Sequence, residues 1–398
     1  MNEHLLASAR TRLGDRRWAW WVPGRIEVLG KHTDYGGGQV LTCATDLGMV
    51  IAAAPIAAPI IRVHSGADCV EVSLDGSIAR TSPSAIYVET IIKRLERNFP
   101  GRLRGTEIVV ASDLPSAAGL SSSSALLTGL VVALAQVAGL TTDPKWPSDL
   151  ASWAACIENG SDHGGLTGER GVGTHGGAMD HTAIVGGSRG LLTHWSFDPA
   201  RKIAEMPLPA GTALVVAVSG VVAEKTGAAR ERYNAVAGRA RAALATWNHE
   251  QNRADRTLAA AVTAGATPAH FTDPDLRQRV EHFRCESTIL VPTAAAALAT
   301  GNLTDFAATV AHSQALTEQL LGNQVPETIA LVALAKAHGG LAASAFGAGF
   351  GGAVWALVPE SDVPAFSATW LTAYHRRFPQ RQATVHRIRP GAGLHAVS

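Results

Sequence analysis

The sequence predicts an α+β protein of two domains, with strands and helices interspersed in both halves. The chain has 398 residues, and domains of about 100–200 residues are the norm, so two domains are expected. Hydrophobic residues make up 46% and charged residues 17% of the chain, a balance typical of a globular protein with ample core material. Proline and charge interrupt the pattern at residues 198–211. We therefore predict domains over residues 1–205 and 206–398.

The spacing of apolar residues predicts the elements in chain order. Strands are expected over residues 18–29, 40–60 (one or two strands), 107–111, 212–218, 341–345, 354–358 and 383–388. Helices are expected over residues 85–98, 122–137, 148–158, 178–185, 223–245, 275–300, 303–320, 326–338 and 363–378.

Charge and composition exclude several classes of protein. The formal net charge of +1 provides no field that would recruit nucleic acid or an anionic membrane. The longest apolar run, residues 126–140, is too short to span a bilayer, and residues 1–10 lack the apolar core of a signal peptide. We therefore expect no nucleic-acid or membrane partner. The four cysteines form no CxxC pair, so we expect them to be reduced thiols in the cytoplasm.

The first unusual loop lies between two apolar strands, at residues 23–38. Its turn carries Arg25, His32 and Asp34, whose side chains can all face one small cavity. A surface hairpin with solvated charges is the alternative.

The second loop, residues 114–125, is rich in small residues and leads directly into a predicted helix. Small side chains let a phosphate chain approach the backbone, where successive N–H groups and the helix dipole favour an anion. A serine N-cap is the alternative, but one serine would suffice for a cap and four follow Leu120. We therefore predict a phosphate-binding loop. The residues expected to hold the nucleotide are Pro115, Gly119, Leu120, Ser121, Ser122, Ser123 and Ser124.

Two glycine patterns imitate other nucleotide motifs. Gly24 and Gly30-Lys31 resemble a P-loop, but five residues separate the glycines instead of four, and His32 stands where Ser or Thr should bind magnesium. Residues 347–352 satisfy GxGxxG, but a strand follows where a dinucleotide site needs a helix. We predict a turn between paired strands that brings Gly347 and Gly349 close to a ligand. A plain glycine hairpin is the alternative.

These three loops, in this order, resemble the signature motifs of the GHMP kinase superfamily, and the galactokinase branch fits best. The family pattern GRxNxxGEHTDYxGG is matched by GRIEVLGKHTDYGGG at residues 24–38. Further matching stretches are LPSAAGLSSSS at 114–124, GGAMDH at 176–181, Tyr233-Asn234, residues 282–286 and GAGFGG at 347–352. The resemblance covers nearly the full chain. It implies a ribosomal-S5-like N-terminal domain and a ferredoxin-like C-terminal domain, with ATP and a sugar meeting in the cleft between them.

The resemblance also implies an activity: phosphoryl transfer from ATP to the anomeric (C1) hydroxyl of galactose or a close relative, by a monomer or weak homodimer. Asp180 would take or orient the hydroxyl proton. Arg25 would keep Asp180 ionised and stabilise charge on the phosphoryl group. Ser122 and Glu158 match the magnesium ligands, with a solvent-facing helix end as the alternative for Glu158. The residues that would line the sugar site are Lys31, His32, Asp34, Gly177 and Tyr233.

Departures from the family pattern bear on the substrate. Lys31 replaces a glutamate that is expected to hold the distal hydroxyl of the sugar. A cation there favours a carboxylate, as in galacturonate, but lysine can also donate to a hydroxyl or point to solvent. Ala117 replaces a loop glycine, and His181 replaces a glutamine. A non-catalytic sugar sensor is a third hypothesis, which loss of Asp180 or of part of the serine loop would favour.

Overall fold

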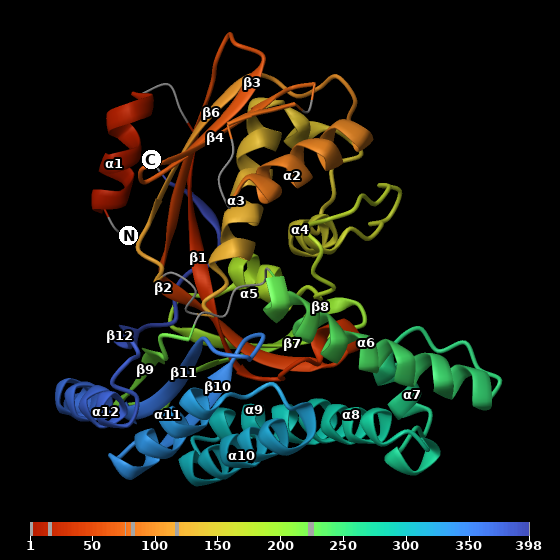
Figure 1. Ribbon diagram of the computed structural model, residues 1–398, viewed down its shortest axis with the longest axis vertical. Helices are drawn as coiled ribbons and strands as arrows, with labels where there is room; N and C mark the ends of the chain where they lie inside the picture. Colours follow the sequence, from red (N-terminus) through yellow and green to blue (C-terminus); the bar gives the residue numbers. More distant parts are fainter. Residues whose placement is uncertain are drawn as a thin grey trace.

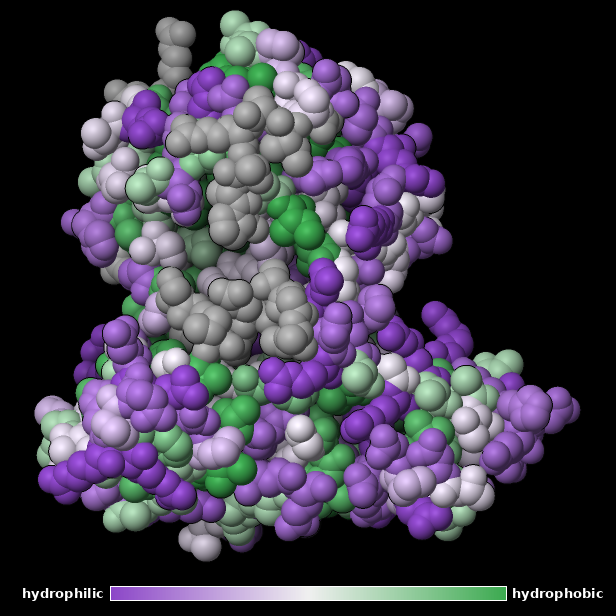
Figure 2. Space-filling model, viewed as in Figure 1, coloured by the Kyte–Doolittle hydropathy of each residue, from purple (hydrophilic) through white to green (hydrophobic). Residues whose placement is uncertain are grey.

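Two β-sheets organise the chain, as the α+β prediction requires. The structure is a computed structural model that describes residues 3–14, 18–75, 77–80, 84–115, 119–221 and 227–397. Each sheet forms the centre of one half of the molecule (Figure 1). In the space-filling view the two halves are lobes joined by a narrower waist (Figure 2).

The first sheet is built around one long strand. Its members are β1 (Trp18–Leu29), β2 (Gln39–Pro55), β3 (Ile60–Ser65), β4 (Asp68–Ser73), β5 (Ile78–Arg80), β6 (Thr106–Ser112), β7 (Leu191–Phe197), β8 (Ala200–Pro207) and β13 (His395–Val397). The order is β13-β1-β2-β6-β3-β4-β5, with β7 paired to β2 and β8 to β7. Strand β2 pairs with β1 on one side, and with both β6 and β7 on the other.

Helices cover both faces of the first sheet (Figure 1). On one face lie α2 (Ala85–Asn98), α3 (Ser122–Val137), α4 (Leu150–Asn159) and α5 (Met179–Gly186). On the other face, α1 (Glu3–Leu13) buries Leu5, Leu6 and Ala9 against residues of β1, β2 and β6. This coverage explains why β1 is buried along all but its first residue.

The second sheet is antiparallel and has the strand order β10-β11-β9-β12, which is the ferredoxin-like order. Its strands are β9 (Thr212–Val218), β10 (Ala342–Phe346), β11 (Ala353–Pro359) and β12 (Thr384–Ile388). The helices of this half are α6 (Gly227–Glu250), α7 (Leu258–Thr263), α8 (Pro274–Cys285), α9 (Val291–Ala299), α10 (Leu303–Leu316), α11 (Pro326–Ala337) and α12 (Val363–Arg377). Alternate residues of β9 belong to different cores, because both faces of this sheet are buried.

The boundary between the two domains stays a prediction, but the sheets bear on it. Strand β8 ends at Pro207 in the first sheet, and β9 begins at Thr212 in the second. The C-terminal strand β13, however, returns to the first sheet and pairs with β1. We therefore propose a division between Pro207 and Thr212, a few residues after the predicted 205/206, with the last strand added to the first domain.

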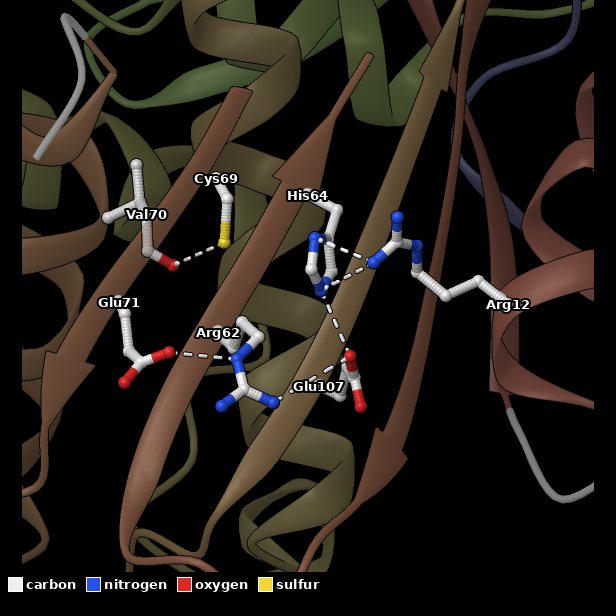
Figure 3. Close-up of polar contacts among 7 residues, drawn as sticks. All are labelled: Arg12, Arg62, His64, Cys69, Val70, Glu71 and Glu107. Atoms are coloured by element: carbon white, nitrogen blue, oxygen red, sulfur yellow. Dashed lines mark hydrogen bonds and ion pairs between the residues drawn. The ribbon is translucent and has the colours of Figure 1, made fainter. Parts of the chain in front are cut away.

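Charged side chains form a chain across strands of the first sheet beside α1 (Figure 3). Arg62 donates to Glu71 over 2.9 Å, and His64 Nε2 lies 2.9 Å from Glu107 Oε1. Arg12 of α1 reaches the His64 ring at 3.1 Å. These pairs are partly solvent-exposed, so each stabilises the fold by about 1 kcal/mol or less.

Two further findings concern the setting of the chain. Within the described ranges, no helix combines the length and hydropathy needed to cross a membrane. The four cysteines are free thiols. The cytoplasmic location inferred from their spacing stays a prediction.

The second lobe should depend strongly on Trp370 of α12. This side chain is 0% exposed, and its Nε1–H donates to the Leu331 carbonyl over 2.9 Å. We expect Trp370→Ala to lower the free energy of unfolding by about 3–5 kcal/mol, because it leaves a cavity and removes this hydrogen bond. Urea denaturation checks this. The control Trp18→Ala, at a side chain 41% exposed, should change it by about 0.5 kcal/mol or less. Equal effects of the two variants would contradict the expectation.

Candidate active site

A buried ion pair lies where the first sheet meets α5. Arg25 is on β1, Asp180 is in the first turn of α5, and Arg25 Nε donates to Asp180 Oδ1 over 2.7 Å. The Arg25 side chain is 3% exposed. It also donates to the carbonyl of Gly119, so the serine loop meets the pair. Because burial strips both charges of water, each ion depends on the other.

Glu158 and a serine complete an acidic cluster beside this pair. Ser124 Oγ donates to Glu158 Oε2 over 3.0 Å and lies 3.4 Å from Asp180 Oδ2. Glu158 is 5% exposed, so its solvent-facing alternative is wrong. Ser122, the serine predicted to act with Glu158, does not take part in these contacts. Two residues along a helix are about 200° apart, and Ser122 instead lines a groove between α3 and α1.

The serine loop begins α3 without an ordinary side-chain cap. Ser121 is the N-cap residue, with a φ of 59° and no capping bond from its hydroxyl. That hydroxyl is buried, and in the described part of the chain it has no hydrogen-bond partner. The carbonyl of Leu120 accepts from the Arg25 N–H over 3.1 Å, which fixes the loop against β1. Ala117 lies outside the described residues.

Asp34 and Gly177 are in close contact in the site. Asp34 Oδ2 accepts from the Met179 N–H over 3.0 Å. A Cβ atom added to Gly177 would lie 2.4 Å from the same oxygen, so only glycine permits this approach. Tyr233 also lines the cavity, with its ring centroid 5.5 Å from that of His32.

His32 connects the first loop to the last glycine loop. Its Nδ1 lies 3.0 Å from the Tyr35 hydroxyl and its Nε2 lies 3.1 Å from the Ala348 carbonyl. Burial, reinforced by the positive charge of Arg279, lowers the pKa of His32 to about 3. The ring is therefore neutral at physiological pH and acts as a hydrogen-bonding link. The GxGxxG segment is a turn between antiparallel β10 and β11, which confirms the rejection of a dinucleotide motif.

One cavity is lined by eight of the seventeen predicted site residues. It is lined by Arg25, Glu27, His32, Asp34, Tyr35, Ala155, Glu158, Asn159, Thr174, Gly176, Gly177, Met179, Asp180, Tyr233, Gly347 and Ala348. The sequence analysis missed Glu27, Asn159 and Thr174. A usable signal existed for Glu27, because residues two apart on a strand point to the same face and Arg25 was already a candidate. Gly349 lies just beyond the lining, where an added Cβ atom would meet Asn323.

Lys31 is not among the residues that line this cavity, and its assignment to the sugar site stays a prediction. The side chain is 1% exposed, so it does not face solvent either. Its Nζ donates to Ser313 Oγ on α10 over 3.0 Å. Glu286 Oε1 accepts from the Lys31 N–H and from Ser313. The ammonium is thus held in a polar contact between the first loop and the helices beneath it.

Comparison with protein families identifies the class of protein that this site belongs to. The galactokinase galactose-binding signature matches residues 10–55, the GHMP kinases N-terminal domain matches residues 86–188, and the GHMP kinases C-terminal domain matches residues 294–376. Together the matches span more than half of the chain. The chain therefore belongs to the GHMP kinase superfamily and is a galactokinase-like sugar kinase, a class that uses ATP.

Solved structures support the same fold. The galactokinase of Lactococcus lactis, solved with galactose, has a TM-score of 0.82 at 23% identity and covers 99% of both chains. The mevalonate kinase of Methanococcus jannaschii has a TM-score of 0.60 at 14% identity, covering 95% of this chain and 99% of its own. Homoserine kinase from Cytophaga hutchinsonii has a TM-score of 0.55 at 15% identity, covering 97% and 99%.

Gly177 should be intolerant of a methyl group. We expect Gly177→Ala to reduce kcat/KM by about 10-fold or more, because the clash with Asp34 displaces a carboxylate in a site that tolerates little misplacement. The measurement is steady-state kinetics of sugar phosphorylation. Gly165→Ala is the matched control in the same glycine-rich segment, since its Cβ meets nothing within 4 Å. A fully active Gly177→Ala enzyme would show that this close contact is dispensable.

Proposed function

We propose that this chain transfers the γ-phosphoryl group of ATP to the C1 hydroxyl of galactose or a closely related neutral sugar. The observation that carries the proposal is the buried Arg25–Asp180 pair, with 2.7 Å between Nε and Oδ1, in a cavity that also holds Asp34 and His32. A carboxylate and a guanidinium in contact provide a proton acceptor and a charge stabiliser for phosphoryl transfer.

In this mechanism Asp180 accepts or orients the proton of the attacking hydroxyl. Arg25 holds the Asp180 carboxylate in place and faces the charge that develops on the phosphoryl oxygens. Asp34, oriented by the Met179 N–H, accepts hydrogen bonds from sugar hydroxyls. Positioning supplies most of the rate enhancement in such a reaction, because the phosphoryl group needs little covalent assistance.

The nucleotide phosphates are assigned to the loop that begins α3. The buried Ser121 hydroxyl lacks a hydrogen-bond partner among the described residues, and the start of a sixteen-residue helix favours an anion. The turn at Gly347 lies beside it, since a Cβ added to Gly347 would be 3.4 Å from the Gly119 carbonyl. The two loops together can enclose a phosphate chain.

The acidic cluster fits a magnesium ion. The Ser124 hydroxyl lies within 3.4 Å of a carboxylate oxygen of Glu158 and of one of Asp180. Mg²⁺ prefers such hard oxygen ligands together with phosphate oxygens. Bound there, Mg²⁺ would neutralise charge on the phosphates. We propose Ser124 and Glu158 as its protein ligands, in place of Ser122 and Glu158.

The charges around the cavity favour a neutral sugar over a hexuronate. The acidic side chains of Asp34, Glu158 and Asp180 line the cavity. The ammonium of Lys31, which motivated galacturonate as an alternative, is held by Ser313 instead. A carboxylate on the substrate would therefore meet like charges, which disfavour it.

The proposal predicts a substrate profile. We expect galactose to support turnover, with galacturonate, glucuronate and mevalonate at least about 10-fold worse in kcat/KM, because a misplaced like charge costs several kcal/mol. Asp180→Asn should lower kcat by about 100-fold or more. The control Asp68→Asn changes an exposed carboxylate and should leave kcat unaltered. The measurement is coupled ATP consumption.

Each other outcome has a definite meaning. Preference for galacturonate would mean that Lys31 moves into the cavity when substrate binds. Full activity of Asp180→Asn would refute the assigned catalytic role. Binding of ATP and sugar without turnover on any substrate would favour a sugar sensor.

The metal assignment has its own matched pair of variants. We expect Ser124→Ala to raise the Mg²⁺ concentration needed for half-maximal activity by about 10-fold, because it removes one oxygen from the cluster. Ser122→Ala, two residues earlier on the other side of α3, should shift it by less than about 2-fold. Activity is titrated with Mg²⁺ at fixed ATP. The reverse order of effects would restore Ser122 as the ligand.

A further inference from the structure

Glu27 is a buried acid in the cavity with an oxygen that none of the described residues hydrogen-bonds. It lies two residues after Arg25 on β1, and the side chain lines the same cavity. The residue is 1% exposed. Among the described residues, Oε1 has no hydrogen-bond partner. Leaving a buried polar atom unpaired is costly, so this oxygen is suited to a partner that arrives with the substrate.

Glu27 and Lys31 both depart from the galactokinase motif, but their side chains lie in different places. In the first motif this chain has Glu27 and Lys31 where the galactokinase pattern has asparagine and glutamate. The Lys31 side chain is held outside the cavity by Ser313. Of these two residues that depart from the pattern, it is therefore Glu27 that lines the cavity.

The protonation state of Glu27 suits its carboxyl group to hydrogen-bond a sugar hydroxyl. Burial raises the pKa of Glu27 to about 8, although the positive charges of Lys31 and Arg25 oppose the shift. At neutral pH the carboxyl group therefore carries a proton in most molecules, and it can donate one hydrogen bond while accepting another. A sugar hydroxyl has the same dual capacity.

We propose that Glu27 is a specificity-determining residue that hydrogen-bonds one hydroxyl of the sugar, other than the hydroxyl that receives the phosphoryl group. The role rests on the proposed sugar-kinase function. Glu27 differs from Asp180 in that it contacts the substrate away from the reacting oxygen, so its loss weakens binding of sugar and leaves ATP untouched.

The test is a cycle that combines protein variants with deoxy sugars. Galactose and its 2-, 3-, 4- and 6-deoxy analogues are compared in the parent enzyme, in Glu27→Ala and in the near-isosteric Glu27→Gln. Readouts are kcat and KM for sugar and for ATP, and sugar binding by calorimetry. Glu205→Ala, at an exposed glutamate on β8, is the control. Thermal melting verifies that each variant is folded.

We expect Glu27→Ala to raise the KM and Kd for galactose about 10-fold or more while the KM for ATP changes less than about 2-fold. Glu27→Gln, which can still donate and accept, should retain most of the affinity. One deoxy analogue should be penalised about 10-fold in the parent and hardly at all in Glu27→Ala, because its missing hydroxyl is the partner of Glu27.

The opposite results separate two failures. If galactose is bound and phosphorylated but every deoxy analogue loses as much in Glu27→Ala as in the parent, Glu27 contacts no hydroxyl and only this inference is wrong. If the parent neither binds nor phosphorylates any of these sugars, the proposed function is wrong, and the role proposed for Glu27 is wrong as well. Should Glu27→Ala fail to fold, the same cycle is run in Glu27→Leu, whose apolar side chain is of similar size and cannot hydrogen-bond. Loss of the penalty at one hydroxyl then supports the contact, and an unchanged pattern rejects it.

Discussion

The buried contact between Arg25 and Asp180 constrains much of the structure. The residues are separated by 155 positions in sequence, and each charge would suffer a desolvation penalty of several kcal/mol without the other. Strand β1 must therefore meet the first turn of α5, and the serine loop must close over both through the Gly119 carbonyl. The same arrangement places a carboxylate and a cation beside the loop that we propose to hold the nucleotide phosphates. The stability of this region and its chemistry thus rest on one contact.

Much of the fold could be predicted from the sequence where apolar periodicity is strong. Helices α2 and α3 and strand β9 begin and end at the predicted residues. The helix predicted over 275–300 is instead divided by a π-helical turn at Glu286–Leu290, where Glu286 turns toward the first loop. Helix α1 and strand β8 were not predicted, because most of their residues are exposed and leave little apolar pattern.

The site was predictable at the level of motifs and less so at the level of side-chain direction. Arg25, His32, Asp34, Gly177, Asp180 and Tyr233 come from distant parts of the sequence and line one cavity. The direction of Ser122 depends on the phase of α3, and that of Lys31 on the backbone of a turn, neither of which a motif records. Glu27 was not predicted because the comparison with the motif used the positions that match it, and Glu27 does not match. Its unpaired oxygen can be recognised only when its burial in the structure is known.

The pairing of β13 with β1 has a consequence for biosynthesis. A ribosome releases the chain from its N-terminus, so β1 emerges long before the strand that lies at its edge. Until β13 (His395–Val397) has been made, residues Ala19–Trp21 of β1 expose unpaired N–H and C=O groups, which are a site for wrong strand pairing. The nascent first sheet therefore lacks this edge strand while the second lobe is made. Its edge at β1 is covered only after every strand of the second sheet has left the ribosome.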